Sequence, residues 1–360
     1  MAAWARMFAP RRADAREDAM PGLDVLRAAL ACGVMTYHLS CQFGTSASGT
    51  HGNMIIAEIG NFGVSAFFVL SGFLLLAPGR AVKPASRFYL SRFWRLAPLY
   101  YLVVLIDIVA RLGMGPAPTP RMVLENLTFA FGLIHPNDAM VSGGWFVGVL
   151  AIFYAVHPLL IRVLAKAGWP ALLALTAGLW WWSVDRTLHG MPSTSSLYQR
   201  FNVYTAAPNH LWLFGLGGLL AELRARLRWR LPAPSSLLAI LALLVLGDAL
   251  AGRFSDHFDI LTGWVRFELC AVAAAVVFVA SVAKTSSTRI EWFVRRLGDL
   301  SLGLFLLHPV FLVVVSRFLG GWPGLSLAVA LTAATAYLSH RFYEQPLIRR
   351  FDPLRAPGRG

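Results

Sequence analysis

Long apolar stretches separated by shorter polar segments run along most of this chain. About ten such stretches can be placed, at residues 23–41, 55–77, 94–112, 144–165, 169–185, 207–222, 236–252, 264–283, 299–318 and 323–342. A helix that crosses a bilayer needs about 17 to 25 predominantly apolar residues. The pattern therefore predicts an all-α, polytopic integral membrane protein with about ten transmembrane helices. The ends of the sixth and seventh stretches are blurred by Pro, Gly and short length.

The composition agrees with a location in the lipid bilayer. Of 360 residues, 57% are hydrophobic and only 14% are charged, whereas soluble domains carry about 25% charged residues. The polar segment 1–20 shows no cleavable signal peptide. The expected organisation is a cytoplasmic N-terminal segment at 1–20, one transmembrane domain at 21–345 and a cytoplasmic tail at 346–360.

Arginine and lysine are distributed in a way that predicts the orientation of the chain. They gather before the first stretch, after the second, fourth, sixth and eighth stretches and at the end of the chain, whereas segment 42–54 has none. The positive-inside rule then places both termini in the cytoplasm. Because the net charge of +14 is spread over these segments, it indicates topology and lipid headgroup contacts and not a nucleic-acid-binding face.

Two ionisable residues, Arg27 and His38, lie within the first stretch. The helical rise between them is about 16 Å. Ionisable residues inside a membrane are functional by default, which makes both candidates for a site. The structural alternatives are an arginine that snorkels to the interface and a hydrogen-bonded core histidine.

Six motifs in a fixed order resemble the acyltransferase-3 family of bacterial membrane O-acyltransferases. They are Pro21–Ala28 followed by His38, Phe62–Phe73, Arg92–Tyr100, Trp145 with Phe153-Tyr154, Ser301-Leu302 with Leu306–Pro309, and His340–Pro346. The resemblance covers residues from about 21 to about 350. It implies a ten-span protein of the bacterial cytoplasmic membrane that moves an acyl group, by default acetyl, from cytoplasmic acyl-CoA to a hydroxyl on the outer side, commonly on a cell-surface glycan.

The resemblance also implies which residues are functional and where this chain departs from the family. The family's arginine and histidine of the first helix and its Arg-x-x-Arg motif map onto Arg27, His38, Arg92 and Arg95. The family usually has a glutamate a few residues after the tryptophan, but no carboxylate follows Trp145 before Tyr154. Acceptor recognition then differs, or another acid takes that place, or the chain lacks the activity.

The chemistry of these residues suits a donor threaded lengthwise into the membrane. Arg27, Arg92 and Arg95 are expected to bind the CoA phosphates, since guanidinium groups bind phosphate bidentately. His38 is expected to be the general base, because an ordinary imidazole is largely neutral at physiological pH. Candidates for oxyanion or acceptor contacts are Ser71, Tyr154, His308 and Trp145.

Each of these residues also has a structural interpretation. Arg92 and Arg95 are expected in a basic cytoplasmic loop, where they could serve topology alone. Ser71 and Gly72 could serve close helix packing, and Pro309 after His308 could mark a kink. Arg341 and Glu344 are expected to form an ion pair across one helical turn and to end the helix before Pro346.

Two polar segments are candidates for acceptor binding, and three cysteines have no assigned chemistry. Segments 113–144 and 186–209 are expected to face outward and to hold a carbohydrate acceptor. Cys32, Cys41 and Cys270 show no metal-ligand spacing, so they are interpreted as packing residues and no metal is expected. The alternative functions are a transporter and a non-catalytic subunit of a glycan-export system, although the chain shows no inverted repeat.

Overall fold

The computed structural model describes residues 20–44, 50–78, 84–114, 116–191, 194–227, 229–251, 261–284 and 288–354. Over these residues the fold is all-α, as predicted, with one isolated bridge between Leu231 and Ala283. Most of the predicted N-terminal segment, 1–19, and the last residues of the predicted tail, 355–360, lie outside the described residues.

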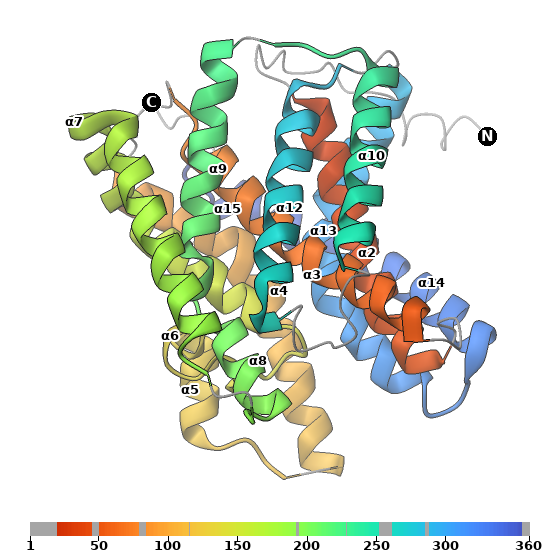
Figure 1. The fold of residues 1–360 in the computed structure, drawn as a ribbon. Coiled ribbons are helices and arrows are strands. Elements are labelled where there is room, and N and C mark those ends of the chain that lie inside the picture. Colours follow the sequence, from red (N-terminus) through yellow and green to blue (C-terminus); the bar gives the residue numbers. More distant parts are fainter. Residues whose placement is uncertain are drawn as a thin grey trace.

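The described part of the chain forms long helices joined by short helical elements (Figure 1). Their bounds are α2 Pro21–Phe43, α3 Thr50–Leu75, α4 Ala85–Met114, α5 Pro120–Thr128, α6 Phe131–Ile134, the 3₁₀ turn η1 Pro136–Asp138, α7 Trp145–Leu188, α8 Leu197–Thr205, α9 Pro208–Leu227, α10 Ala233–Ala251, α12 Trp264–Val282, α13 Thr288–Val315, α14 Gly321–Ser339, the π-helical turn η2 His340–Glu344 and α15 Gln345–Phe351.

Each predicted apolar stretch falls mainly within one of these helices. The fourth and fifth stretches share α7, which consists of two helices that meet at Gly168, where φ is 67°. By length and composition, five described helices can cross a membrane: Ala85–Gly113, Trp145–Leu188, Trp264–Val282, Arg295–Val315 and Gly321–Phe351. The count of ten spans and the cytoplasmic position of both termini stay predictions.

Helix α4 begins earlier than the sequence analysis expects. It starts at Ala85, so Arg92 and Arg95 lie within a helix and the expectation of a loop is wrong. The physical reason is that no Gly or Pro interrupts residues 85–97. Phe88 and Leu96, two helical turns apart, both pack into the core, and a helix that can bury one face is stable beyond the membrane stretch itself.

The end of the last long helix also differs from the expectation. The carboxylate of Glu344 accepts a hydrogen bond from Ser339 at 3.1 Å, and the guanidinium of Arg341 lies over the ring of Phe342. The predicted Arg341–Glu344 pair is therefore wrong. The helix does not stop before Pro346 either, because a π-helical turn leads directly into α15. Pro346 occupies the first turn of α15, where its missing N–H is not needed.

The bundle has two ends of different character. At one end, called the arginine end here, Asp24 at the start of α2 contacts Arg295 on α13, and Arg224 at the end of α9 donates to the carbonyl of Ser281. The opposite end, called the loop end, carries α5, α6 and α8 (Figure 1). There Asn137 and Thr205 share a hydrogen bond of 3.2 Å, which joins the two polar segments that the sequence singles out as acceptor loops.

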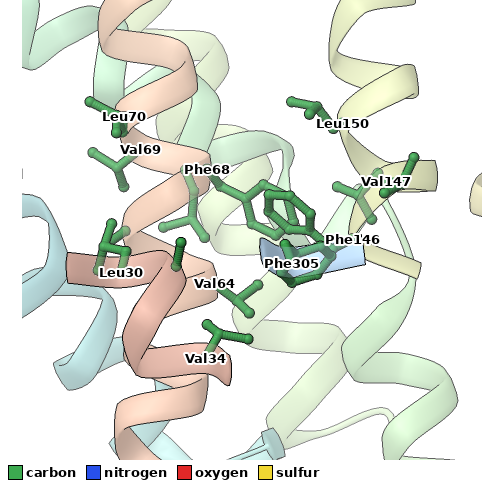
Figure 2. Packing of buried hydrophobic residues seen from close by; sticks show 14 of the residues in the cluster. Leu30, Val34, Val64, Phe68, Val69, Leu70, Phe146, Val147, Leu150 and Phe305 are labelled. Atoms are coloured by element: carbon green, nitrogen blue, oxygen red, sulfur yellow. The ribbon is translucent and has the colours of Figure 1, made fainter. Parts of the chain in front are cut away.

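An apolar layer fills the bundle between the two ends. It consists of Leu30 and Val34 on α2, Val64 and Phe68 on α3, Phe146 on α7 and Phe305 on α13, all buried. Figure 2 shows the rings of this layer packed together, and the ring centres of Phe68 and Phe305 are each 4.9 Å from that of Phe146. Val34 and Phe305 lie one helical turn before the two histidines of the candidate site on the same helices.

Helix α3 packs backbone to backbone against α9 at Gly72. A Cβ atom at this position would lie 1.9 Å from the carbonyl oxygen of Phe214. We therefore expect Gly72→Ala to push the helices apart and to lower the free energy of unfolding by about 1–3 kcal/mol, the usual cost of overpacking. The measurement is the thermal midpoint of the purified protein in detergent.

Gly178 in α7 provides the matched control for this substitution. A Cβ atom there would meet nothing within 4 Å, so Gly178→Ala should not lower the thermal midpoint, because alanine is favoured over glycine inside a helix. Equal midpoints for both variants would contradict close packing at Gly72.

Candidate active site

The central feature of the site is a pair of histidines. His38 on α2 and His308 on α13 stack with their ring centres 5.2 Å apart and their planes 23° apart. The Nδ1 atom of His308 lies 3.0 Å from the carbonyl oxygen of Leu304. Because a carbonyl only accepts, Nδ1 is assigned the proton and Nε2 keeps a lone pair. The structure thus brings together two residues that the sequence analysis selects from opposite ends of the chain.

Arg27 lies at the arginine end of α2 and is held by a carboxylate. Its Nη1 atom is 3.4 Å from Asp24 Oδ1, and the other oxygen of Asp24 is 3.7 Å from Arg295 Nε. The geometry therefore supports a role of Asp24 in orienting Arg27. Arg295 is an additional cation that the sequence analysis does not assign to the site.

The two arginines of α4 lie in different settings. The guanidinium carbon of Arg92 is 5.6 Å from the ring centre of Phe88 and 5.8 Å from that of Tyr154, and its buried Nε has no hydrogen-bond partner. Arg95 Nε is 3.3 Å from Oδ2 of Asp352, a fully buried carboxylate. No carboxylate in the described parts of the chain pairs with Arg92. Of the three predicted phosphate ligands, Arg92 is therefore the one whose positive charge no described carboxylate balances.

The four residues that are candidates for oxyanion or acceptor contacts lie in different parts of the structure. His308 lies against His38, whereas Tyr154 lies beside Arg92. The hydroxyl of Ser71 donates to the carbonyl of Phe67 at 2.8 Å, and Gly72 next to it serves helix packing. Trp145 stacks on His210 with ring centres 5.4 Å apart. The roles assigned to these residues stay predictions.

The structure offers no carboxylate at the position that carries glutamate in the family pattern. Leu150, five residues after Trp145, is buried in the core (Figure 2). An apolar side chain in this place packs against the same core as Phe146. Acceptor recognition, if the chain performs it, has to rely on other groups.

A buried polar group that the sequence analysis misses lies near the loop end. It consists of Tyr204 on α8, Asn209 and His210 on α9 and Arg266 on α12, called the Arg266 cluster here. Arg266 Nη2 donates to the carbonyl of Asn209 at 2.9 Å, and its guanidinium lies 5.3 Å from the ring centre of Tyr204. His210 Nε2 lies 2.6 Å from the carbonyl of Tyr204. Arg266 carried a usable signal, because it is a charge within the predicted stretch 264–283.

The Arg266 cluster borders the histidine pair. Helix α12, which carries Arg266, packs against α2, where the ring centre of Tyr37 is 4.8 Å from that of His38. The ring of Phe68 in the apolar layer is likewise 4.8 Å from that of His210. Polar groups from α2, α8, α9, α12 and α13 therefore meet on the loop-end side of the apolar layer.

A group of possible metal ligands lies on the loop end. Single ligand atoms of Glu125, His135 and Asp138 come within 4.8 Å of one another. The guanidinium of Arg121 contacts all three, at 3.0, 2.8 and 2.7 Å. Hydrogen bonds from Arg121 to Asp138 and Glu125 raise its pKa, so a cation already sits among these carboxylates. The geometry indicates an ion-pair network that ties α5 to the turn at Asp138.

A pocket of about 410 Å³ opens beside the Arg266 cluster. It is called the Trp182 pocket here and is lined by Trp182, Arg186, Asn202, Val203, Ala206 and Asn209. All but Trp182 belong to the polar segment 186–209, which the sequence analysis expects to hold an acceptor. A second pocket of about 530 Å³ between α4 and α5 is lined almost entirely by aliphatic side chains, including Ile108, Leu112 and Leu124, and offers little to a polar ligand.

Comparison with known proteins shows which family the chain belongs to. The family model described as an acyltransferase domain matches residues 20–340. An acyltransferase of Streptomyces mycarofaciens, MdmB, is 24% identical over 92% of this chain and 92% of its own length. Two proteins named as peptidoglycan O-acetyltransferases, YrhL of Bacillus subtilis and OatA of Listeria monocytogenes, are 26% and 23% identical over 91% of this chain. The chain spans 55% and 56% of their lengths. No solved structure matches.

Proposed function

Because the chain belongs to the acyltransferase family whose domain covers residues 20–340, we propose that it moves an acetyl group from acetyl-CoA to a hydroxyl of a glycan across the cytoplasmic membrane of a bacterium. The observation that carries this proposal is the His38–His308 pair on the far side of an apolar layer from Arg27. A long donor with an anionic end and a thioester end fits that separation.

The transfer step follows from the positions of the two histidines. An acceptor hydroxyl loses its proton to the imidazole of His38 as its oxygen attacks the thioester carbonyl carbon. The carbon–sulfur bond then breaks, and the CoA thiolate leaves and takes up the proton from the imidazole. His308, with its Nδ1–H bound to Leu304, presents a lone pair to the same space and positions the stacked ring of His38.

The arginine end supplies binding for the nucleotide part of the donor. Arg92 has aromatic rings on one side and no carboxylate partner in the described structure. Arg27 and Arg95 lie beside the carboxylates of Asp24 and Asp352. Guanidinium groups of this kind bind phosphate oxygens bidentately. Glycan acceptors are supported by the names of two relatives, the peptidoglycan O-acetyltransferases.

The test is a direct transfer assay with the full chain in lipid nanodiscs. The protein is incubated with radiolabelled acetyl-CoA and soluble peptidoglycan glycan strands, and base-labile label on the strands is counted. Acetyl-CoA binding is measured in parallel. Label that appears in the strands supports the proposal, whereas a protein that neither binds acetyl-CoA nor labels any strand contradicts it and favours a transport or non-catalytic role.

A further inference from the structure

The Arg266 cluster contains buried polar atoms that the protein does not satisfy. Four of them have no hydrogen-bond partner in the described structure: Tyr204 Oη, Asn209 Oδ1, His210 Nδ1 and Arg266 Nη1. Arg266 is 3% exposed and pairs with no described carboxylate. Buried polar groups in native proteins are almost always hydrogen-bonded. Four unpaired atoms on three neighbouring helices therefore indicate a partner from outside the chain.

The chemistry of the four atoms identifies the kind of partner. Arg266 Nη1 can only donate, and the Tyr204 hydroxyl can donate or accept. Asn209 Oδ1 accepts, and so does His210 Nδ1, because Nε2 of the same ring points its proton at the Tyr204 carbonyl. Burial raises the pKa of Tyr204, so its hydroxyl keeps its proton.

The mixture of donors and acceptors distinguishes between an oxyanion and a sugar as the ligand. The oxyanion of an acyl-transfer intermediate accepts only, and two acceptor atoms beside it would repel it. A sugar hydroxyl both donates and accepts, so neighbouring hydroxyls of one ring can satisfy all four atoms. The ring of Trp145, 5.2 Å from that of Tyr204, adds the flat apolar surface that a sugar ring can cover.

The cluster lies between a pocket at the loop end and the apolar layer that borders the histidines. Asn209 belongs to both the cluster and the Trp182 pocket, which has the indole of Trp182 and the amide of Asn202 in its lining. On the opposite side the ring centre of His210 is 4.8 Å from that of Phe68 in the apolar layer, and the ring centre of Phe305 in the same layer is 6.0 Å from that of His308. A ligand in the cluster would therefore lie between the loop end and the candidate base.

We propose that the Arg266 cluster is the acceptor subsite: it binds hydroxyl groups of a glycan that enters through the Trp182 pocket and presents its next hydroxyl to His38. This inference rests on the proposed function and adds which residues recognise the acceptor. It also offers a replacement for the glutamate that the chain lacks after Trp145, because the guanidinium of Arg266 on α12 and the amide of Asn209 on α9 would recognise the acceptor instead.

The sharpest test is Tyr204→Phe, which removes one unpaired hydroxyl and nothing else. Loss of one hydrogen bond to the ligand should raise both the KM and the Kd for soluble peptidoglycan glycan strands about three- to tenfold. The Kd for acetyl-CoA should stay unchanged. The thermal midpoint should not fall, because the hydroxyl has no partner in the protein.

Tyr100→Phe is the matched control. Tyr100 is equally buried, but its hydroxyl donates to Asn126 Oδ1 at 2.6 Å. Its loss should lower the thermal midpoint and leave the KM for glycan strands unchanged. Arg266→Gln should raise the KM and Kd for strands more than Tyr204→Phe does, with monodispersity in detergent as the check on folding; if this variant does not fold, Tyr204→Phe decides.

The outcomes separate the inference from the proposed function. Unchanged KM and Kd for strands in Tyr204→Phe, beside a wild-type protein that labels the strands, would overturn the subsite while transfer activity itself stands. A fall in turnover with unchanged KM, together with lost acetyl-CoA hydrolysis, would overturn it in favour of an oxyanion role. A wild-type protein that transfers no acetyl group removes the proposed function and the subsite together.

Discussion

Replacing His38 with alanine is expected to lower acyl transfer by about 10²- to 10⁴-fold, the usual contribution of a general base. The imidazole stacks on His308 at 5.2 Å and lies beyond the apolar layer from Arg27. It is therefore too far along α2 to hold the nucleotide end of the donor. Turnover should collapse while acetyl-CoA affinity and the thermal midpoint stay close to those of the wild type, all measured in one detergent preparation.

Thr36→Ala is the control for this experiment, because Thr36 lies on the exposed face of the same helix two residues away. It should leave turnover unchanged. Near-normal turnover in His38→Ala would exclude His38 as the base. A larger loss in His308→Ala than in His38→Ala would instead assign the base to α13, where Nε2 of His308 keeps its lone pair.

Arg92→Ala is expected to weaken acetyl-CoA binding about 10- to 100-fold, because a hydrogen bond to a charged group contributes about 1.5–3 kcal/mol. The loss should shrink as salt rises, since the lost contacts are between charges. Arg92→Lys should restore affinity only in part, because lysine keeps the charge without the planar fork. Arg95→Ala should cost less, because Asp352 already balances the charge of Arg95.

The controls for Arg92 use the same helix and a shortened donor. Arg87 is exposed and also lies on α4, so Arg87→Ala removes one positive charge without touching the aromatic setting and should bind acetyl-CoA as the wild type does. The difference in affinity between wild type and Arg92→Ala should be smaller for dephospho-CoA than for CoA, since dephospho-CoA has one phosphate fewer. If Arg92→Ala and Arg95→Ala bind acetyl-CoA normally but insert with altered topology in a reporter-fusion assay, both arginines serve topology alone.

Much of the helical fold is predictable because the lipid bilayer constrains it. An apolar run long enough to span has to be helical, which is why α12 and α14 lie where hydropathy places them. Helix ends outside the apolar run obey local packing instead, so α4 starts at Ala85 rather than near Trp94. The break in α7 at Gly168 lies in the gap between the predicted stretches 144–165 and 169–185, so hydropathy marks its place but not the backbone angle that makes it.

The candidate site is predictable only where its residues stand out within the sequence of a single helix. His38 and Arg27 stand out because each is ionisable within one apolar stretch, whereas stacking of His38 on His308 depends on how α2 packs against α13. The Arg266 cluster draws Tyr204, His210 and Arg266 from three helices, and a tyrosine or histidine at a helix end is unremarkable by itself. Only the fold shows that their unpaired atoms face one another.

The apolar layer between Arg27 and the histidine pair has an electrical consequence. Protons cross proteins along chains of hydrogen-bonding groups, and the side chains of Leu30, Val34, Val64, Phe68, Phe146 and Phe305 provide none. A thioester with a short acyl group can pass between such side chains, but a hydrated ion would lose its water there at a cost of many kcal/mol. We therefore expect the cell to keep its transmembrane proton gradient while this protein works, and substitution of Phe146 or Phe305 by a small polar residue to make the membrane leaky.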